Sequence, residues 1–405
     1  MGSTLVFLGV GAAGGSVVAA CQGTEDPGDK PVPCAGAGSI CTWAGSGERA
    51  FTGDGQQALE AALYWPLDVE FAPAPDQRGY VLDWQNHRVR RVAKDGIITT
   101  VIGTDEIGDG PGPGAGNEGV APGVPGTAVN LNHPTDIQFT PDGTLLLASW
   151  HNHKIRRYDV ASELIRVSCG KGPGFSGDGG PAESALMSMP KAIAVAPSGD
   201  VFVADTRNFR VRRIAGDTGM ISTVVGVGTR GSAGDGGNPL AAQLSFQKGL
   251  DQAGGDGGDN PEPGGAVALD AQGRLYIADT ENHRVRRVDF DLGTIETVAG
   301  DGTAGGDGDG GPATQAQLRF PRDIEIAPDG RLFIADTDNQ RIRAVDLQTG
   351  IIDTIAGNGM ASYGGDGGPA KAAALHRPWG IGFDGRGDLF IADTFNDRVR
   401  RVVQP

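Results

Sequence analysis

One motif occurs six times along this chain: an apolar run, an acidic residue, a short polar turn with an asparagine, and arginines that alternate with aliphatic residues. Residues 275–288 show it as LYIADTENHRVRRV. The six turn asparagines are Asn86, Asn152, Asn208, Asn282, Asn339 and Asn396. The last three follow one another at an equal interval of 57 residues, and two longer intervals indicate insertions. Internal repetition of this kind indicates a repeat architecture, in which each unit needs its neighbours to bury its apolar face.

A single repeat unit, residues 321–357, contains four candidate strands. The short runs PRDIEIAP, RLFIAD, QRIRAVD and IIDTIAG are separated by the turn sequences DG, TDN and LQTG. Asn, Asp and Gly favour tight turns because they tolerate left-handed backbone conformations. The unit therefore predicts four antiparallel strands, which is one blade of a β-propeller. The next stretch crosses to the following blade, and Pro369 within it favours the start of one helical turn.

The two ends of the chain carry complementary parts of one blade. A fourth-strand sequence stands at residues 39–45, before any complete unit, whereas the chain ends shortly after a third strand. A closed ring pairs both ends if residues 39–45 form the outermost strand of the blade made by residues 378–403. No long stretch has helical periodicity, and 68 glycines and 25 prolines fit a chain rich in turns. We predict an all-β fold, a closed six-bladed β-propeller of four-stranded blades.

The repeated ADTxNxRVRR cores and the FSGDGGPAxxAxL crossings, such as residues 175–186, resemble those of NHL-repeat proteins of the bacterial secreted type. The resemblance covers most of the chain. It implies the propeller fold, but propellers of this kind include binding modules, RNA binders, lyases and lactonases, so it leaves the function open.

The repeated arginines predict a structural role. We expect them to pair with carboxylates such as Asp83 or Asp279, and with backbone carbonyls between blades, because the guanidinium fork donates several hydrogen bonds at fixed geometry. A nucleic-acid interface would need a basic face, whereas the chain has a net charge of −16 and many of its 34 Lys and Arg residues stand in the repeats. We expect no nucleic-acid partner.

The N-terminal stretch, residues 5–20, is apolar and rich in small residues (LVFLGVGAAGGSVVAA). It is short for a membrane span, which needs about 20 residues. It ends in VAAC, which resembles a lipoprotein signal with Cys21 as the lipidated residue, although the usual basic n-region is missing. An ordinary cleaved signal peptide is the alternative. By the same resemblance, Gln22 fits an outer-membrane address.

We therefore expect an exported protein of the cell envelope, either an outer-membrane lipoprotein held only by its lipid anchor or a periplasmic or secreted protein. The predicted domains are a signal peptide, a flexible tether and the propeller, at residues 1–20, 21–38 and 39–405. We expect the protein to be a monomer.

The cysteines after the signal have two predicted roles. Cys34 and Cys41 are close in sequence, and an exported chain permits disulfides, so a bond between them would tie the tether to the closing strand. Cys169 takes the place of Ala or Val in a fourth strand, which predicts a small buried apolar residue.

Departures from the repeat point to a candidate ligand site. The turn that usually reads DTxN becomes DWQNH and SWHNH in the first two blades, and two further tryptophans begin the first strands of blades one and six. The candidate ligand-binding residues are Trp65, Trp84, His87, Trp150, His151, His153 and Trp379. Exposed Trp and His side chains in loops suggest recognition of a glycan, a peptide or a protein surface. The alternative is that each indole only covers the end of its own blade.

A second candidate site lies at the mouth of the axial channel. Asp68, Asp136 and Asp323 each stand two positions after the proline that opens a first strand. Three carboxylates near one axis could hold Ca²⁺, which would favour a metal-assisted hydrolase, lactonase or lyase. They could equally pair with Lys191 and Arg322, or face water.

Other metal interpretations are weaker. His87, His153 and His283 share one repeat position and could bind zinc, but other residues occupy that position in the remaining blades. The repeated GDGG crossings are better explained by turn chemistry than by calcium binding. Two insertions, residues 104–130 and 245–263, are either lids or flexible loops. The favoured function is an exported binding module, and the metal-assisted enzyme is the alternative.

Overall fold

The computed structural model describes residues 33–246 and 262–405. The predicted signal peptide, the lipidation candidate Cys21, most of the tether and most of the second insertion lie outside these residues. Within the two described ranges, no helix is long and apolar enough to cross a membrane.

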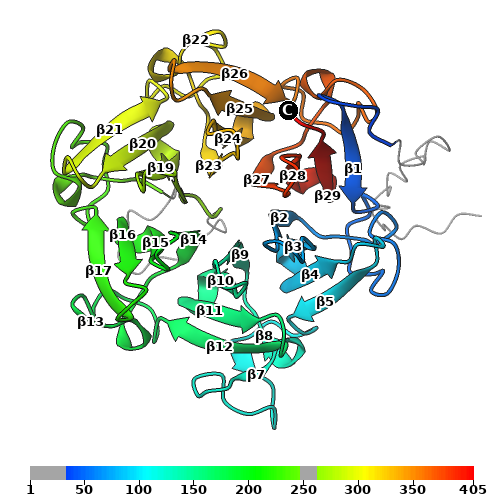
Figure 1. Cartoon of the computed structure of the whole chain (residues 1–405), viewed down its shortest axis with the longest axis vertical. Helices are drawn as coiled ribbons and strands as arrows, with labels where there is room; N and C mark the ends of the chain where they lie inside the picture. Colours follow the sequence, from blue (N-terminus) through cyan, green and yellow to red (C-terminus); the bar gives the residue numbers. More distant parts are fainter. Residues whose placement is uncertain (1–32, 247–261) are drawn as a thin grey trace, which may run out of the picture. The chain divides into compact units, whose positions relative to one another are not determined.

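Six antiparallel sheets surround a central axis, as the ring of strands in Figure 1 shows. The first three blades, from the innermost strand outward, are β2 (Pro66–Phe71), β3 (Gly79–Asp83), β4 (Arg88–Val92) and β5 (Ile98–Ile102); β9 (Pro134–Phe139), β10 (Leu145–Ser149), β11 (Lys154–Asp159) and β12 (Leu164–Cys169); and β14 (Pro190–Val195), β15 (Val201–Asp205), β16 (Arg210–Ile214) and β17 (Met220–Val225). The last three are β18 (Ala266–Leu269), β19 (Leu275–Asp279), β20 (Arg284–Asp289) and β21 (Thr294–Ala299); β23 (Pro321–Ile326), β24 (Leu332–Asp336), β25 (Arg341–Val345) and β26 (Ile351–Ala356); and β27 (Pro378–Phe383), β28 (Leu389–Asp393), β29 (Arg398–Val402) and β1 (Ile40–Ala44).

Short elements occupy the turns and crossings. A single 3-10 turn joins the second and third strand of every blade: η1 (Trp84–Asn86), η3 (Trp150–Asn152), η5 (Thr206–Asn208), η7 (Thr280–Asn282), η9 (Thr337–Asn339) and η11 (Thr394–Asn396). The crossings contain η2 (Gly126–Ala128), η4 (Ala182–Ser184), η6 (Pro239–Ala241), η8 (Ala313–Gln315), η10 (Ala370–Ala372) and the two-residue strands β6 (Gly110–Pro111), β7 (Val124–Pro125), β8 (Val129–Asn130), β13 (Gly180–Pro181) and β22 (Gly311–Pro312).

The ring closes through the N-terminal strand, which confirms the predicted fold. β1 pairs antiparallel with β29, so that Ile40 lies opposite Val402. The pairing satisfies backbone groups that would otherwise form an open sheet edge. A disulfide joins Cys34 to Cys41, and it ties the segment before β1 to β1 itself.

One arginine in the middle of each third strand is fully buried, which confirms the structural role predicted for the repeats. The six are Arg90, Arg156, Arg212, Arg286, Arg343 and Arg400. In blade five, Arg343 Nη2 donates to Asp309 Oδ1 at 2.6 Å and Nη1 donates to the Gln317 carbonyl at 2.8 Å. Asp336 lies 3.8 Å from Nη1. Buried charges are tolerated when they are paired and hydrogen-bonded in this way.

The aspartate of the GDGG crossing therefore does more than form a turn, which was its predicted role. Asp309 belongs to such a crossing, and its second oxygen accepts a hydrogen bond from Thr354 Oγ1 at 2.6 Å. It thus joins the crossing to both the third and the fourth strand of blade five.

The turn asparagines have a matching structural role. In blade five, Asn339 Nδ2 donates to Asp336 Oδ2 at 2.8 Å and to the Gly305 carbonyl at 2.6 Å. The other Asp336 oxygen accepts from the backbone N–H of Arg319 at 2.7 Å. The acidic residue at the end of the second strand and the asparagine therefore fasten the incoming crossing to the blade.

Candidate functional site

Three of the predicted tryptophans lie side by side, although the first and last of them, Trp65 and Trp379, are more than 300 residues apart in the sequence. Trp65 stands before β2, Trp84 begins η1 and Trp379 lies in β27. The ring centroids of Trp65 and Trp84 are 6.0 Å apart, and those of Trp84 and Trp379 are 5.7 Å apart. Closure of the ring brings blades six and one together and so forms this contact.

The aromatic cluster continues into blade two through His133. Its ring centroid lies 5.1 Å from that of Trp84 and 4.9 Å from that of His151. His151 in turn stacks on Trp150 at 4.1 Å. His133 was not predicted as a site residue, yet the sequence contains a signal for it, because His133 precedes Pro134 just as Trp65 precedes Pro66.

The indoles are more deeply buried than the sequence predicted. Trp84, Trp150 and Trp379 are only 4%, 1% and 3% exposed, and His87 is only 6% exposed, so the prediction of exposed side chains was wrong for these four. The three indoles pack with apolar residues of first and second strands, such as Leu67 and Leu147, in one core cluster that spans the blades. The sequence shows that Trp84 and Trp150 stand in turns, but not that the neighbouring blade covers them.

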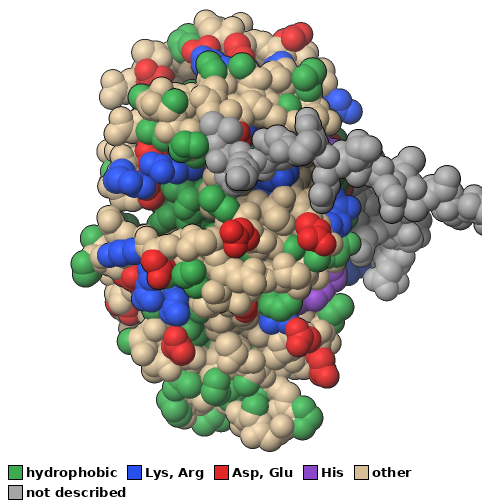
Figure 2. Space-filling model, turned by 90° about the vertical axis from the view of Figure 1, so that its right-hand side faces the viewer, with side chains coloured by type: hydrophobic (Ala, Val, Ile, Leu, Met, Phe, Trp, Pro, Cys, Tyr) green, Lys and Arg blue, Asp and Glu red, His purple; other side chains and the backbone are tan. Residues whose placement is uncertain are grey.

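A half-buried layer of rings covers the buried indoles. Trp65, His133, His151 and Phe395 are partly exposed, and we call these four the aromatic surface. Phe395, in η11 of blade six, stacks on Trp65 at 4.8 Å. In Figure 2, a side view, the visible histidine side chains lie towards one flat face of the ring.

The tryptophans in and beneath this surface have unpaired donors. Within the described part of the chain, the indole N–H groups of Trp65, Trp84, Trp150 and Trp379 are buried without a hydrogen-bond partner. Buried polar groups are nearly always paired, and exceptions often mark functional sites. The four tryptophans thus combine rigid packing with unused donors.

The histidines near this surface are uncharged at neutral pH. Burial lowers the pKa of His87, His133 and His151 to about 4, and the neighbouring imidazoles act in the same direction for His87 and His151. A neutral imidazole has one hydrogen-bond donor and one acceptor. The aromatic surface is therefore neutral in a protein whose net charge is −16.

His87 and His153 fasten neighbouring blades, as does His283, the third histidine at this repeat position. Each has a left-handed backbone and ends the 3-10 turn. Each Nδ1 accepts a hydrogen bond from a backbone N–H of the next blade, at His133 (3.1 Å), Met189 (3.1 Å) and Phe320 (3.2 Å). The histidine at this repeat position therefore accepts a hydrogen bond from the next blade in three separate places.

The channel aspartates also connect neighbouring blades. The Oδ2 atoms of Asp68, Asp136 and Asp323 accept hydrogen bonds from the backbone N–H groups of Ile137 (2.9 Å), Ile193 (2.7 Å) and Ile381 (2.9 Å). The predicted partner Lys191 donates instead to the Arg322 carbonyl at 2.9 Å. In blade six the corresponding residue is Gly380, where a Cβ would lie 2.2 Å from the Leu67 carbonyl oxygen.

Burial is the main cause of the raised pKa values of these aspartates. It raises the pKa of Asp323 to about 7, and burial together with the charge of Asp68 holds the pKa of Asp136 well above its usual range. The nearby Lys191 ammonium opposes both shifts. Among the described residues, no group of three or more His, Cys, Asp or Glu side chains is arranged to hold a metal ion. Calcium at Asp68, Asp136 and Asp323 stays a prediction.

The end of the second insertion is fastened beside the channel. Glu262 accepts hydrogen bonds from Arg377 Nη1 at 2.6 Å and from Arg322 Nη2 at 2.5 Å. Both guanidinium groups lie over the Trp379 ring, at 5.6 Å and 4.8 Å from its centroid. The chain thus enters blade four next to the aromatic cluster.

Comparisons with known proteins agree with this architecture. The family model of the Teneurin NHL domain matches residues 266–363, and the NHL repeat model matches residues 187–214. The chain is 29% identical to SUPPRESSOR OF QUENCHING 1, a chloroplastic protein of Arabidopsis thaliana, over 282 residues that cover 67% of this chain and 24% of that protein. It is 28% identical to NHL repeat-containing protein 2 of Gallus gallus over 299 residues, 68% of this chain and 38% of that protein. The chain thus spans well under half of the length of these relatives.

A solved structure shares the fold. The auxiliary nutrient binding protein from Bacteroides ovatus superposes with a TM-score of 0.59 at 16% sequence identity, and the alignment covers 90% of this chain and 76% of that one. The family models match repeats in blades three to five, and every blade of the structure is built from the same unit, so this chain is an NHL-repeat protein with a six-bladed β-propeller fold.

Proposed function

We propose that the protein is an exported binding module, which holds a protein, peptide or glycan ligand against the aromatic surface of Trp65, His133, His151 and Phe395. The observation that carries the proposal is the continuous chain of rings across blades six, one and two. Its outer members are partly exposed, and its inner members retain unpaired indole N–H groups.

The two layers suit recognition for physical reasons. Aromatic rings offer a large contact area with few rotatable bonds, so a ligand that covers them loses little side-chain entropy. The buried indoles of Trp84, Trp150 and Trp379 fix the outer rings from below. Arg49 lies 5.3 Å from the Trp65 ring and 5.6 Å from the Tyr64 ring, and it adds a cationic group at the edge. Trp, Tyr and Arg, the residue types of Trp65, Tyr64 and Arg49, are enriched among interface residues that contribute most of the binding energy.

Export is supported by the disulfide between Cys34 and Cys41, because disulfides persist mainly in oxidising compartments. A fusion of the N-terminal residues to a periplasmic reporter tests export. The lipid anchor is tested separately, since a Cys21→Ser variant should move from the detergent phase to the aqueous phase. If both proteins partition alike, the anchor proposal fails.

The binding proposal is tested on glycan and peptide arrays with three proteins. The wild type should bind a defined set of array features, and a double variant, Trp65→Ala with His133→Ala, should lose them. Phe320→Ala is the matched control, because Phe320 occupies the same left-handed position before the first-strand proline in blade five, outside the aromatic surface. It should keep the same features. A wild type that binds nothing, or a double variant that binds equally well, would contradict the proposal.

The metal-assisted hydrolase, lactonase or lyase is less favoured by the geometry. That function needs ionised carboxylates at the channel, whereas burial raises the pKa of Asp68, Asp136 and Asp323, and each already accepts a backbone hydrogen bond from the next blade. Elemental analysis of untagged protein discriminates the two functions. Stoichiometric calcium or zinc, with a thermal shift when the metal is added, would favour the enzyme.

A further inference from the structure

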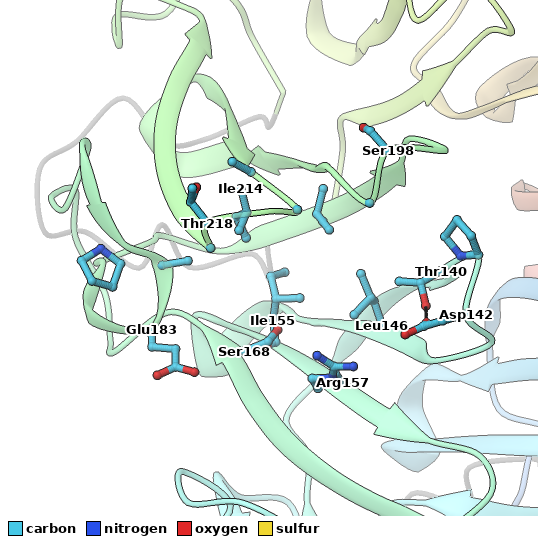
Figure 3. Close-up of a pocket in the computed structure, with 18 of the residues that line it drawn as sticks. Thr140, Asp142, Leu146, Ile155, Arg157, Ser168, Glu183, Ser198, Ile214 and Thr218 are labelled. Carbon is cyan, nitrogen blue, oxygen red and sulfur yellow. Dashed lines mark hydrogen bonds between the residues drawn. The ribbon is translucent and has the colours of Figure 1, made fainter.

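A groove with a volume of about 650 Å³ lies between blades two and three (Figure 3). Its walls include the turn between β9 and β10 at Thr140 and Asp142, and the turn between β16 and β17 at Thr218. These turns stand at the opposite ends of the strands from the 3-10 turns of the aromatic cluster. In Figure 3, Leu146, Ile155 and Arg157 of blade two lie on one side of the groove, and Ile214 of blade three lies on the opposite side.

A departure from the repeat explains the groove. The second residue of the second strand is aromatic in five blades: Tyr80, Phe202, Tyr276, Phe333 and Phe390. In blade two it is Leu146. The aromatic side chains fill the space towards the next blade, as Phe333 does against Phe383 at 5.0 Å and Phe390 against Phe71 at 4.4 Å. Leu146 packs instead in a cluster with the smaller Val195, so the wedge between these blades stays partly open.

The charge pattern of the groove wall also departs from the repeat. Arg157 of β11 lies directly opposite Arg166 of β12. The corresponding pairs in the other blades are Arg91 with Thr99, Arg213 with Ser222, Arg287 with Glu296, Ala344 with Asp353 and Arg401 with Cys41. Like charges directly opposite one another on a sheet are destabilising. Blade two therefore keeps an arrangement that costs stability.

In the part of the chain that the structure describes, neither guanidinium group donates a hydrogen bond to a carboxylate, although the charge of Arg157, after the Thr140 hydrogen bond, contributes to lowering the pKa of Asp142. Within the described residues, Arg157 makes no ion pair within 4.0 Å, and its hydrogen bond is a long one of 3.4 Å to Thr144 Oγ1. Arg166 lies 3.9 Å from Glu183, whose side chain is 69% exposed. The other acid of the groove, Asp142, accepts hydrogen bonds from Thr140 Oγ1 and from the Thr144 backbone within its own turn.

We propose that this groove is a binding site for a small organic monocarboxylate with an apolar body. The carboxylate lies between Arg157 and Arg166, because guanidinium groups bind carboxylates through paired hydrogen bonds. The apolar part lies along Leu146, Ile155 and Ile214. The volume is in the range of small-molecule sites, and the acids at the rim disfavour ligands with several negative charges. The site is independent of the aromatic surface and of the function proposed for it.

The test uses octanoate and phenylacetate as probes, with octylamine as the charge-reversed control, in calorimetric titrations at low ionic strength. The wild type should bind at least one carboxylate and bind octylamine at least tenfold more weakly, which corresponds to about 1.4 kcal/mol. Absence of binding by both carboxylates, or equal binding of octylamine, would overturn the proposal.

Two substitutions locate the site. Leu146→Phe should abolish binding while the protein stays folded, because phenylalanine is the residue that blades three, five and six have at this position. Arg157→Gln should weaken carboxylate binding at least tenfold. Arg287→Gln changes the corresponding position of blade four and should bind like the wild type. If Leu146→Phe and Arg157→Gln both bind like the wild type, the ligand lies elsewhere and the assignment fails.

Discussion

Blade five and blade two come from the same repeat, but they neutralise their buried arginines in different ways. In blade five, the partner of Arg343 is Asp309 of the short GDGG crossing, and Asp336 at the end of β24 stands close by. In blade two, the crossing is replaced by the insertion of residues 104–130, and Ser149 stands where blade five has Asp336.

The insertion supplies the missing carboxylates. Arg156 Nε donates to Glu118 Oε2 at 2.8 Å, and Arg156 Nη2 donates to Asp109 Oδ1 at 2.7 Å. Glu118 is buried, with a side chain 7% exposed. The propeller therefore places a carboxylate beside each buried guanidinium without needing one particular crossing sequence. The same blade holds the leucine and the opposed arginines of the groove, so blade two departs from the repeat at several positions together.

The largest expected effect follows from removal of the arginine in the regular blade. Arg343→Met should lower the free energy of unfolding by about 3–5 kcal/mol, because Asp309 loses its cation and the Gln317 carbonyl loses its hydrogen-bond donor. Denaturant unfolding measures the change. The control is Arg331→Met, which removes a partly exposed arginine of the same blade and should cost less than about 1 kcal/mol. A loss of under about 1 kcal/mol for Arg343→Met would show that the pair contributes little to the blade.

A smaller effect is expected for the partner in the irregular blade. Glu118→Gln should lower the free energy of unfolding by about 1–3 kcal/mol, since Asp109 still pairs with Arg156 and the amide oxygen still accepts a hydrogen bond. Glu106→Gln is the control within the same insertion, because Glu106 is exposed, and it should leave stability unchanged. Equal unfolding curves for wild type and Glu118→Gln would mean that the insertion is not a structural substitute for the crossing.

The regular features of the molecule could be predicted from sequence because they repeat. The strand sequences, the ring closure through residues 39–45 and the pairing of the arginines all follow from six copies of one pattern. The role of Asp309 was missed because its partner Arg343 lies in the following blade unit, and turn chemistry alone already explains the sequence GDGG.

The depth of side chains could not be predicted in the same way. Trp84 and Trp150 stand in turns, where exposure is the usual outcome, but neighbouring inner strands cover them. The groove was missed for a related reason. A leucine at position 146 is unremarkable in a strand, and only alignment of the six second strands reveals that the other blades have an aromatic residue there.

The pH dependence of stability should also distinguish the two blades. Burial raises the pKa of Asp336 to about 7 in the folded protein, whereas an unfolded aspartate titrates near pH 3.9. Between about pH 4 and pH 7 the folded state keeps a proton that the unfolded state has lost, so this contribution is full below about pH 4 and is lost as the pH rises through about 7.

Asp336→Asn removes this titrating group. Between about pH 4 and pH 7, the variant should lose less stability per pH unit than the wild type, with a difference of at most about 1.4 kcal/mol per pH unit. Ser149→Ala in blade two removes a group that does not titrate, and it should leave the pH profile parallel to that of the wild type. A wild-type profile that Asp336→Asn leaves unchanged would mean that Asp336 is ionised throughout this range.

The smallest expected effect concerns the opposed arginines, and it has the opposite sign. Arg166→Thr gives blade two the residue that faces the corresponding arginine in blade one, and it removes the repulsion between Arg157 and Arg166. We expect the free energy of unfolding to rise by about 0.2–1 kcal/mol at low ionic strength, and the gain to shrink with added salt. The control Arg287→Gln breaks an attractive pair with Glu296 and should not stabilise the protein. The other five blades have no arginine at the position of Arg166, and blade two keeps one at a cost in stability, so we explain Arg166 by a use other than folding. A loss of stability in Arg166→Thr would therefore remove the main argument for an anionic ligand in the groove.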